Sequence, residues 1–282
     1  MKYRYAILSL ICLLLGSRIV TGQDPNFHIY LCFGQSNMEG TAAIEEQDKI
    51  PHERFWVMQS VDCSKQGYAK NEWRSAVPPL TSCYTGLSPA DYFGRTMVRY
   101  LPDSIKVGVI VVAVGGSDIR LFDKDIYENY LNTHQKSWFI KKIEDYGHNP
   151  YQHLTNLART AQKDGVIKGI LLHQGETNTG DQQWPNYVNK VYTDLLLDLN
   201  LSATEVPILS GKVVDEDQFG KCARMNPIIE MLPQTIPTAH VVESRGCAAK
   251  ADSVHFNTIG MRELGKRYAE KMIEVKGINS VQ

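Results

Sequence analysis

Residues 27–33 read Phe-His-Ile-Tyr-Leu-Cys-Phe and run directly into Gly34-Gln35-Ser36-Asn37-Met38. This nearly continuous apolar run does not alternate with polar residues, which predicts a strand buried on both faces. Four further apolar, β-branched runs follow along the chain, at residues 106–114, 166–172, 206–213 and 238–242. The chain is therefore predicted to contain about five buried strands.

Amphipathic helical patterns lie between these runs. Ser88-Pro89-Ala90-Asp91 combines an N-cap, a first-turn proline and an acidic residue at the start of a helix. Apolar residues recur at helical spacing in three further segments, residues 151–161, 188–199 and 257–272. Alternating strands and helices predict an α/β protein whose central parallel sheet is covered by helices on both sides. Residues 40–87 and 115–149 are irregular, and the first is interpreted as a functional loop or lid.

The N-terminus has the pattern of a signal peptide. Lys2 and Arg4 precede an apolar run at residues 6–15, and small residues lead to Gln23. The run is shorter than the roughly 20 residues that a membrane span needs. We expect residues 1–22 to be removed, leaving residues 23–282 as one secreted or periplasmic domain that is not inserted in a membrane. An uncleaved anchor is the alternative.

The charge balance argues against nucleic-acid or membrane partners. The chain has a formal net charge of −1, and loss of the three basic residues in residues 1–22 makes it −4, because that segment has no acidic residue. Such a chain does not attract nucleic acid or an anionic membrane. No Cys-x-x-Cys or His-x-x-x-His spacing occurs, so the sequence predicts neither a metal site nor a cofactor.

The cysteines suit an exported protein. Six are present, and loss of Cys12 with the signal peptide leaves five, of which one must stay unpaired. Cys32 lies in an apolar run and is interpreted as a buried thiol. The simplest pairing gives two disulfides, Cys63–Cys83 and Cys222–Cys247. Five free thiols are the alternative.

Two sequence blocks follow predicted strands and carry candidate catalytic groups. Ser36 lies where the first strand ends, so its hydroxyl can be exposed at the edge of the sheet; a serine nucleophile needs a base and an oxyanion site. Gly115-Gly116 follows the next strand, and paired glycines let backbone N–H groups approach developing negative charge. Either block alone is also compatible with a plain turn.

Two further blocks supply polar groups. In His173-Gln174-Gly175-Glu176 the amide of Gln174 can donate a hydrogen bond, and Glu176 is either an orienting acid or a structural carboxylate. Asp252 precedes His255 by three residues, so it can bind one ring nitrogen and leave the other to accept a proton, although a surface turn has the same spacing. All four blocks lie at a strand's carboxyl end or a helix entry, where α/β proteins bind ligands.

In order and spacing, these four blocks resemble those of the SGNH hydrolases, and within them the branch of sialate O-acetylesterases and family-six acetylxylan esterases. The resemblance covers nearly all of residues 27–275. It implies a three-layer α/β/α, flavodoxin-like fold and ester hydrolysis without a metal.

The resemblance also implies roles for individual residues. It assigns a catalytic triad of nucleophile Ser36, base His255 and orienting acid Asp252. The N–H groups of Ser36 and Gly116, with the amide of Gln174, are expected to hold the oxyanion. The wider superfamily has asparagine in the third block, where this chain has Gln174, and Glu176 remains a rival or helper for Asp252.

We therefore expect transfer of an acetyl group from carbohydrate to Ser36 and then to water. Acetylated xylan is the first expected substrate and acetylated sialic acid the alternative. Four aromatic residues are interpreted as possible sugar-stacking groups: Trp56, Trp73, Tyr84 and Trp184. A non-catalytic carbohydrate-binding protein and a metal-dependent deacetylase are the alternatives from other classes.

Overall fold

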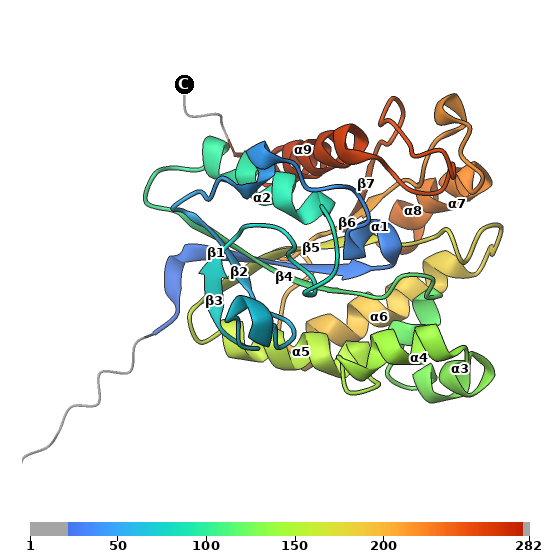
Figure 1. The fold of residues 1–282 in the computed structure, drawn as a ribbon, viewed down its shortest axis with the longest axis horizontal. Helices are drawn as coiled ribbons and strands as arrows, with labels where there is room; N and C mark the ends of the chain where they lie inside the picture. Colours follow the sequence, from blue (N-terminus) through green and yellow to red (C-terminus); the bar gives the residue numbers. More distant parts are fainter. Residues whose placement is uncertain (1–21, 279–282) are drawn as a thin grey trace, which may run out of the picture.

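A seven-stranded sheet forms the centre of the computed structural model, which describes residues 22–278 (Figure 1). The strands lie in the order β3-β2-β4-β1-β5-β6-β7, and only β3 runs antiparallel to its neighbour. Their bounds are β1 Asp24–Gly34, β2 Phe55–Met58, β3 Trp73–Ser75, β4 Lys106–Ala113, β5 Gly165–His173, β6 Ile208–Gly211 and β7 Ala239–Val242. The predicted α/β class is confirmed, with two more strands than expected.

Strand β1 lies in the middle of the sheet between β4 and β5. Ile29, Leu31 and Phe33 pack into the core on one face, whereas Tyr30 and Cys32 pack into the core on the other. Successive side chains of β1 therefore enter the cores on opposite faces of the sheet. This explains why the run is apolar without alternation.

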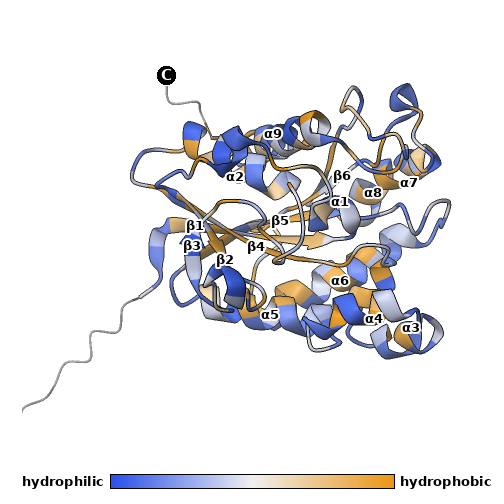
Figure 2. Ribbon diagram, in the orientation of Figure 1, coloured by the Kyte–Doolittle hydropathy of each residue, from blue (hydrophilic) through white to orange (hydrophobic). Residues whose placement is uncertain are grey.

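Helices cover both faces of the sheet (Figure 1). One face carries α2 (Pro89–Tyr100) and α9 (Thr258–Val275), and the other carries α5 (Pro150–Ala161) and α6 (Trp184–Asp198). Apolar residues concentrate in the strands and in the helix surfaces that face them (Figure 2). The result is the three-layer α/β/α arrangement that the resemblance implied.

The described residues also form five shorter α-helices, α1 (Ser36–Glu39), α3 (Tyr127–Thr133), α4 (Ser137–Glu144), α7 (Asn226–Glu230) and α8 (Leu232–Thr235), and several 3-10 turns. The irregular stretch 40–87 contains β2 and β3, which extend the sheet beyond β4. The stretch 115–149 contains α3 and α4. These elements are three to eight residues long, so they carry too few periods to stand out in the sequence.

The cysteine pairing was half right. Cys63 and Cys83 form a disulfide, and Cys32 is a buried free thiol, as predicted. The predicted Cys222–Cys247 disulfide is wrong, because both cysteines are free. Cys247 belongs to the core beneath α2 and α9, whereas Cys222 packs against the core on the opposite face.

Residues 1–21 of the predicted signal peptide lie outside the described residues, so its cleavage stays a prediction. Within residues 22–278, no helix has both the length and the apolar character needed to span a bilayer.

Candidate active site

The four sequence blocks meet at the carboxyl ends of adjacent strands. Ser36 begins α1 directly after β1, Gly116 lies beyond the end of β4, and Gln174 follows β5. Because β4, β1 and β5 are neighbours in the sheet, the loops that follow them converge. The loop that precedes α9 brings His255 to the same place.

Ser36, His255 and Asp252 form a hydrogen-bonded chain. His255 Nε2 lies 2.9 Å from Ser36 Oγ, and His255 Nδ1 lies 2.8 Å from Asp252 Oδ2. The other carboxylate oxygen of Asp252 accepts the backbone N–H groups of Val254 and His255, each at 2.9 Å. This is the geometry in which a carboxylate fixes the ring and leaves Nε2 to accept the serine proton.

The environment of Asp252 favours its ionised form. Partial burial opposes ionisation, but the hydrogen bonds from the His255 ring and from the two backbone N–H groups outweigh it and lower the pKa of Asp252 to about 2. The carboxylate therefore stays charged at any pH at which a histidine base works.

Asn37 holds the loop that carries His255. Its Nδ2 donates to Val254 O at 3.1 Å, and its Oδ1 accepts the N–H of Phe256 at 3.1 Å. Asn37 thus binds the residues on both sides of His255. Since Asn37 directly follows Ser36, one two-residue segment positions the Ser36 hydroxyl and the His255 ring relative to each other.

Glu176 acts through Asn37 and does not touch His255. Its Oε1 accepts a 2.5 Å hydrogen bond from Asn37 Nδ2 and lies 3.6 Å from the ring nitrogen of buried His173. Burial raises the pKa of Glu176, but the contacts with His173 and Asn37 outweigh it and leave the pKa below its ordinary value. Of the two acids, Asp252 is therefore the one that contacts the His255 ring, and Glu176 binds the Asn37 side chain that holds the His255 loop.

Two backbone N–H groups are free to bind an oxyanion. Neither Ser36 N nor Gly116 N donates to any acceptor among residues 22–278. A Cβ atom on Gly115 would lie 2.6 Å from Glu39 Oε2 and 3.4 Å from Ser36 Cβ. Only glycine lets the backbone pass this close to Ser36 and Glu39.

Gln174 lies beneath the site. It is 0% exposed, and its Nε2 donates to Gln35 Oε1, Ser117 O and Asn178 Oδ1 at 3.1, 3.2 and 2.7 Å. Its Oε1 accepts a hydrogen bond from Trp184 Nε1. Every polar group of the Gln174 amide therefore has a partner inside the protein. Trp184, interpreted from the sequence as a possible sugar platform, is instead a buried core residue.

An open cleft with two exposed aromatic side chains is lined in part by Glu39, the last residue of the short helix that Ser36 begins. Tyr84 is 82% and Trp138 is 52% exposed, and both line a cavity of about 530 Å³ beside the Glu39–Lys142 ion pair. The Trp138 ring lies 2.9 Å from where a Cβ of Gly116 would be. Tyr84 was a sequence candidate, whereas Trp138 was missed.

Trp56 and Trp73 do not line this cleft. Trp73 packs against Phe27 near the start of β1, with ring centroids 4.7 Å apart, and Trp56 pairs with Gly108 early in β4. Both side chains therefore lie toward the amino ends of β1 and β4, whereas Ser36 lies at the carboxyl end of β1.

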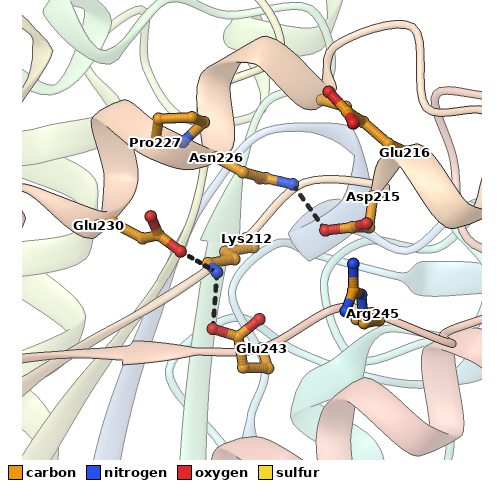
Figure 3. A pocket seen from close by; sticks show the side chains of 9 residues that line it. Lys212, Asp215, Glu216, Asn226, Pro227, Glu230, Glu243 and Arg245 are labelled. Carbon is orange, nitrogen blue, oxygen red and sulfur yellow. Dashed lines mark hydrogen bonds and ion pairs between the residues drawn. The ribbon is translucent and has the colours of Figure 1, made fainter.

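Two other polar clusters lie apart from these catalytic candidates. A pocket of about 410 Å³ follows β6 and β7, where Lys212 pairs with Glu230 and Glu243 (Figure 3).

In the part of the chain that the structure describes, one cluster of three carboxylates has metal-ligand spacing: Asp123, Asp125 and Asp194. The ammonium group of Lys190 lies within 4 Å of all three, so an internal cation balances their charge.

Comparison with known proteins identifies a family and a fold. The family model described as carbohydrate esterase, sialic acid-specific acetylesterase, matches residues 26–274. A solved Arabidopsis thaliana protein has 20% identity and a TM-score of 0.68, covering 89% of this chain and 99% of its own. NanS has 15% identity and a TM-score of 0.62, covering 91% and 99%. XAC1771, a novel carbohydrate acetylesterase from Xanthomonas citri, has 15% identity and a TM-score of 0.59, covering 88% and 56%. At these identities the structures show that the chain shares their fold.

Proposed function

Because the chain belongs to the carbohydrate esterase family of sialic acid-specific acetylesterases, we propose that it is a serine esterase that removes O-acetyl groups from carbohydrate. The observation that carries the proposal is the chain of contacts from Ser36 Oγ through both ring nitrogens of His255 to Asp252. A carbohydrate-binding protein without catalysis has no need of a base at 2.9 Å from an otherwise unactivated hydroxyl.

The geometry supports a two-step reaction. The Ser36 hydroxyl attacks the acetyl carbonyl carbon while His255 Nε2 takes its proton, and the N–H groups of Ser36 and Gly116 bind the developing oxyanion. The C–O bond to the sugar breaks, and the sugar hydroxyl leaves with the proton from His255. Water, deprotonated by His255, then attacks the acetyl-serine. The bond between Ser36 Oγ and the acetyl carbon breaks, His255 returns the proton to Ser36 Oγ, and acetate leaves.

O-acetylated sialic acid is the substrate that we propose first. The description of the matching family names it, whereas xylan, expected from the sequence, has no comparable support. The cleft fits a sugar in either case, because Tyr84 and Trp138 expose aromatic faces on which a pyranose ring can pack. Action outside the cytoplasm, as the N-terminal sequence predicts, is part of the proposal.

The test is acetate release from an O-acetylated sialic acid and from acetylated xylan oligosaccharides. The mature protein is compared with its Ser36→Ala variant, and each is assayed with and without a chelator. We expect chelator-insensitive release from the sialic acid ester that falls on the order of 10⁶-fold, to background, in the variant. Release from xylan alone would keep the mechanism and change the substrate. Absence of release from both esters would contradict the proposal.

A further inference from the structure

We propose that the side-chain amide of Gln35, and not that of Gln174, is the third donor to the oxyanion. The inference rests on the proposed esterase function. It starts from the observation that both N–H groups of Gln174 are used by three internal acceptors. A donor that is already satisfied and fully buried has no N–H group left to bind substrate.

Hydrogen bonds fix the orientation of the Gln35 amide. Its Oε1 accepts from the backbone N–H groups of Gly175 and Thr177 at 3.4 and 3.2 Å, and from Gln174 Nε2 at 3.1 Å. A backbone N–H can only donate, so exchanging the amide oxygen and nitrogen would set donors against donors. The oxygen therefore faces the loop after β5, and Nε2 points away from that loop. Among residues 22–278, nothing accepts a hydrogen bond from Gln35 Nε2.

The position of Gln35 places this free donor beside the other two. Gln35 immediately precedes Ser36, is 2% exposed, and is held by a 3.0 Å bond from its own N–H to His173 O. Gln174 Nε2 lies between Gln35 Oε1 and Ser117 O, so the Gln35 amide lies next to the loop that carries Gly116. The Gln35 amide therefore lies between the two loops that supply the N–H groups of Ser36 and Gly116, which is where the proposal needs its free N–H groups.

Gln174 then has a positioning role. It holds the oxygen of the Gln35 amide, while Trp184 and Asn178 hold Gln174 in turn. A donor locked in this way needs no reorganisation when charge develops, which is the condition for strong transition-state stabilisation.

The substitution Gln35→Glu tests the proposal with little change of shape. One carboxylate oxygen can still accept the three hydrogen bonds, while the other replaces the donating Nε2 and repels an oxyanion. We expect kcat to fall by about 100- to 1000-fold or more with little change in KM, because the donor acts in the transition state. Affinity for methylboronic acid, which forms a tetrahedral anionic adduct on serine, should fall in parallel.

Gln174→Glu is the matched control. It sets a carboxylate oxygen against three acceptor oxygens, so its main expected effect is a lower melting temperature, whereas Gln35→Glu should melt close to the wild type. If Gln35→Glu does not fold, Gln35→Asn withdraws the amide by one methylene, and the same loss of kcat is expected. A folded Gln35 variant with wild-type kcat and boronate affinity would overturn the inference and leave the esterase function intact. A wild-type protein that releases no acetate would overturn the function itself.

Discussion

The imidazole of His255 lies 2.9 Å from the hydroxyl oxygen of Ser36, although 219 residues separate them in the chain. The contact is maintained by the residue after the nucleophile, because Asn37 binds Val254 and Phe256 on either side of His255. The nucleophile and the loop that carries its base are therefore held by one short segment at the end of β1.

Asn37→Ala should lower both activity and stability. Loss of the hydrogen bonds from Asn37 to Val254 and Phe256 lets the His255 loop shift. A displacement of about 1 Å can cost about 100-fold in kcat. It also leaves the Phe256 N–H without a partner, which costs about 1–3 kcal/mol in the free energy of unfolding. Steady-state kinetics and urea unfolding measure the two effects, with exposed Asn156→Ala as control. Wild-type kcat in Asn37→Ala would show that these contacts are not needed to position His255.

Asp252→Asn should reduce activity and change its pH dependence. The wild-type carboxylate, with a pKa of about 2, stays ionised and stabilises the imidazolium that forms during catalysis. A neutral amide does not, so kcat should fall by about 100-fold or more. The acid limb of the kcat/KM profile should also move to lower pH. An unchanged acid limb would show that Asp252 is not coupled to His255.

Glu176→Gln should make stability less sensitive to acid. The pKa of Glu176 is below its ordinary value in the folded protein, because the contacts with His173 and Asn37 outweigh burial. Ionised Glu176 therefore stabilises the fold above the pKa of an unfolded glutamate, about 4.3, and that contribution is lost as pH falls through the folded pKa. Urea unfolding between about pH 7 and pH 3 should show a smaller loss of stability in the variant. If the free energy of unfolding falls equally with pH in the wild type and the variant, ionised Glu176 does not stabilise the fold.

Trp138→Ala and Tyr84→Ala should weaken binding of sugar esters selectively. Each removes an exposed aromatic face from the cleft that Glu39 and Lys142 also line. Loss of about 1.4 kcal/mol of stacking corresponds to a tenfold rise in KM for the acetylated sugar. Hydrolysis of 4-nitrophenyl acetate, which lacks a sugar, is the internal control. Equal losses on both substrates would indicate damage to the catalytic groups instead of a sugar site.

The long strands were predictable because burial on both faces leaves a continuous apolar run, as in β1 and β4. The short strands β2 and β3 were not, since four and three residues carry no clear period. The wrong cysteine pair has a different cause. Position in the chain does not reveal that Cys222 and Cys247 pack on opposite faces of the sheet.

Most catalytic candidates were visible because their spacing is local: Asp252 reaches His255 within one turn, and Ser36 directly follows a strand. The supporting contacts were not. The contact of Asn37 with the His255 loop, and the hydrogen bonds of Gln174 to Gln35 and Ser117, join segments more than 50 residues apart and arise only from tertiary packing. Trp138 lies on a short helix of eight residues, and it becomes notable only because it lies next to Gly116.

The most direct test of the central claim is detection of the acyl-enzyme. The wild-type protein is mixed with an O-acetylated sialic acid, quenched in acid during turnover, digested and analysed by mass spectrometry. A peptide that carries one acetyl group on Ser36, absent without substrate and absent in Ser36→Ala, is the predicted result. Continued acetate release by Ser36→Ala, with no acetylated peptide in the wild type, would contradict Ser36 as the nucleophile.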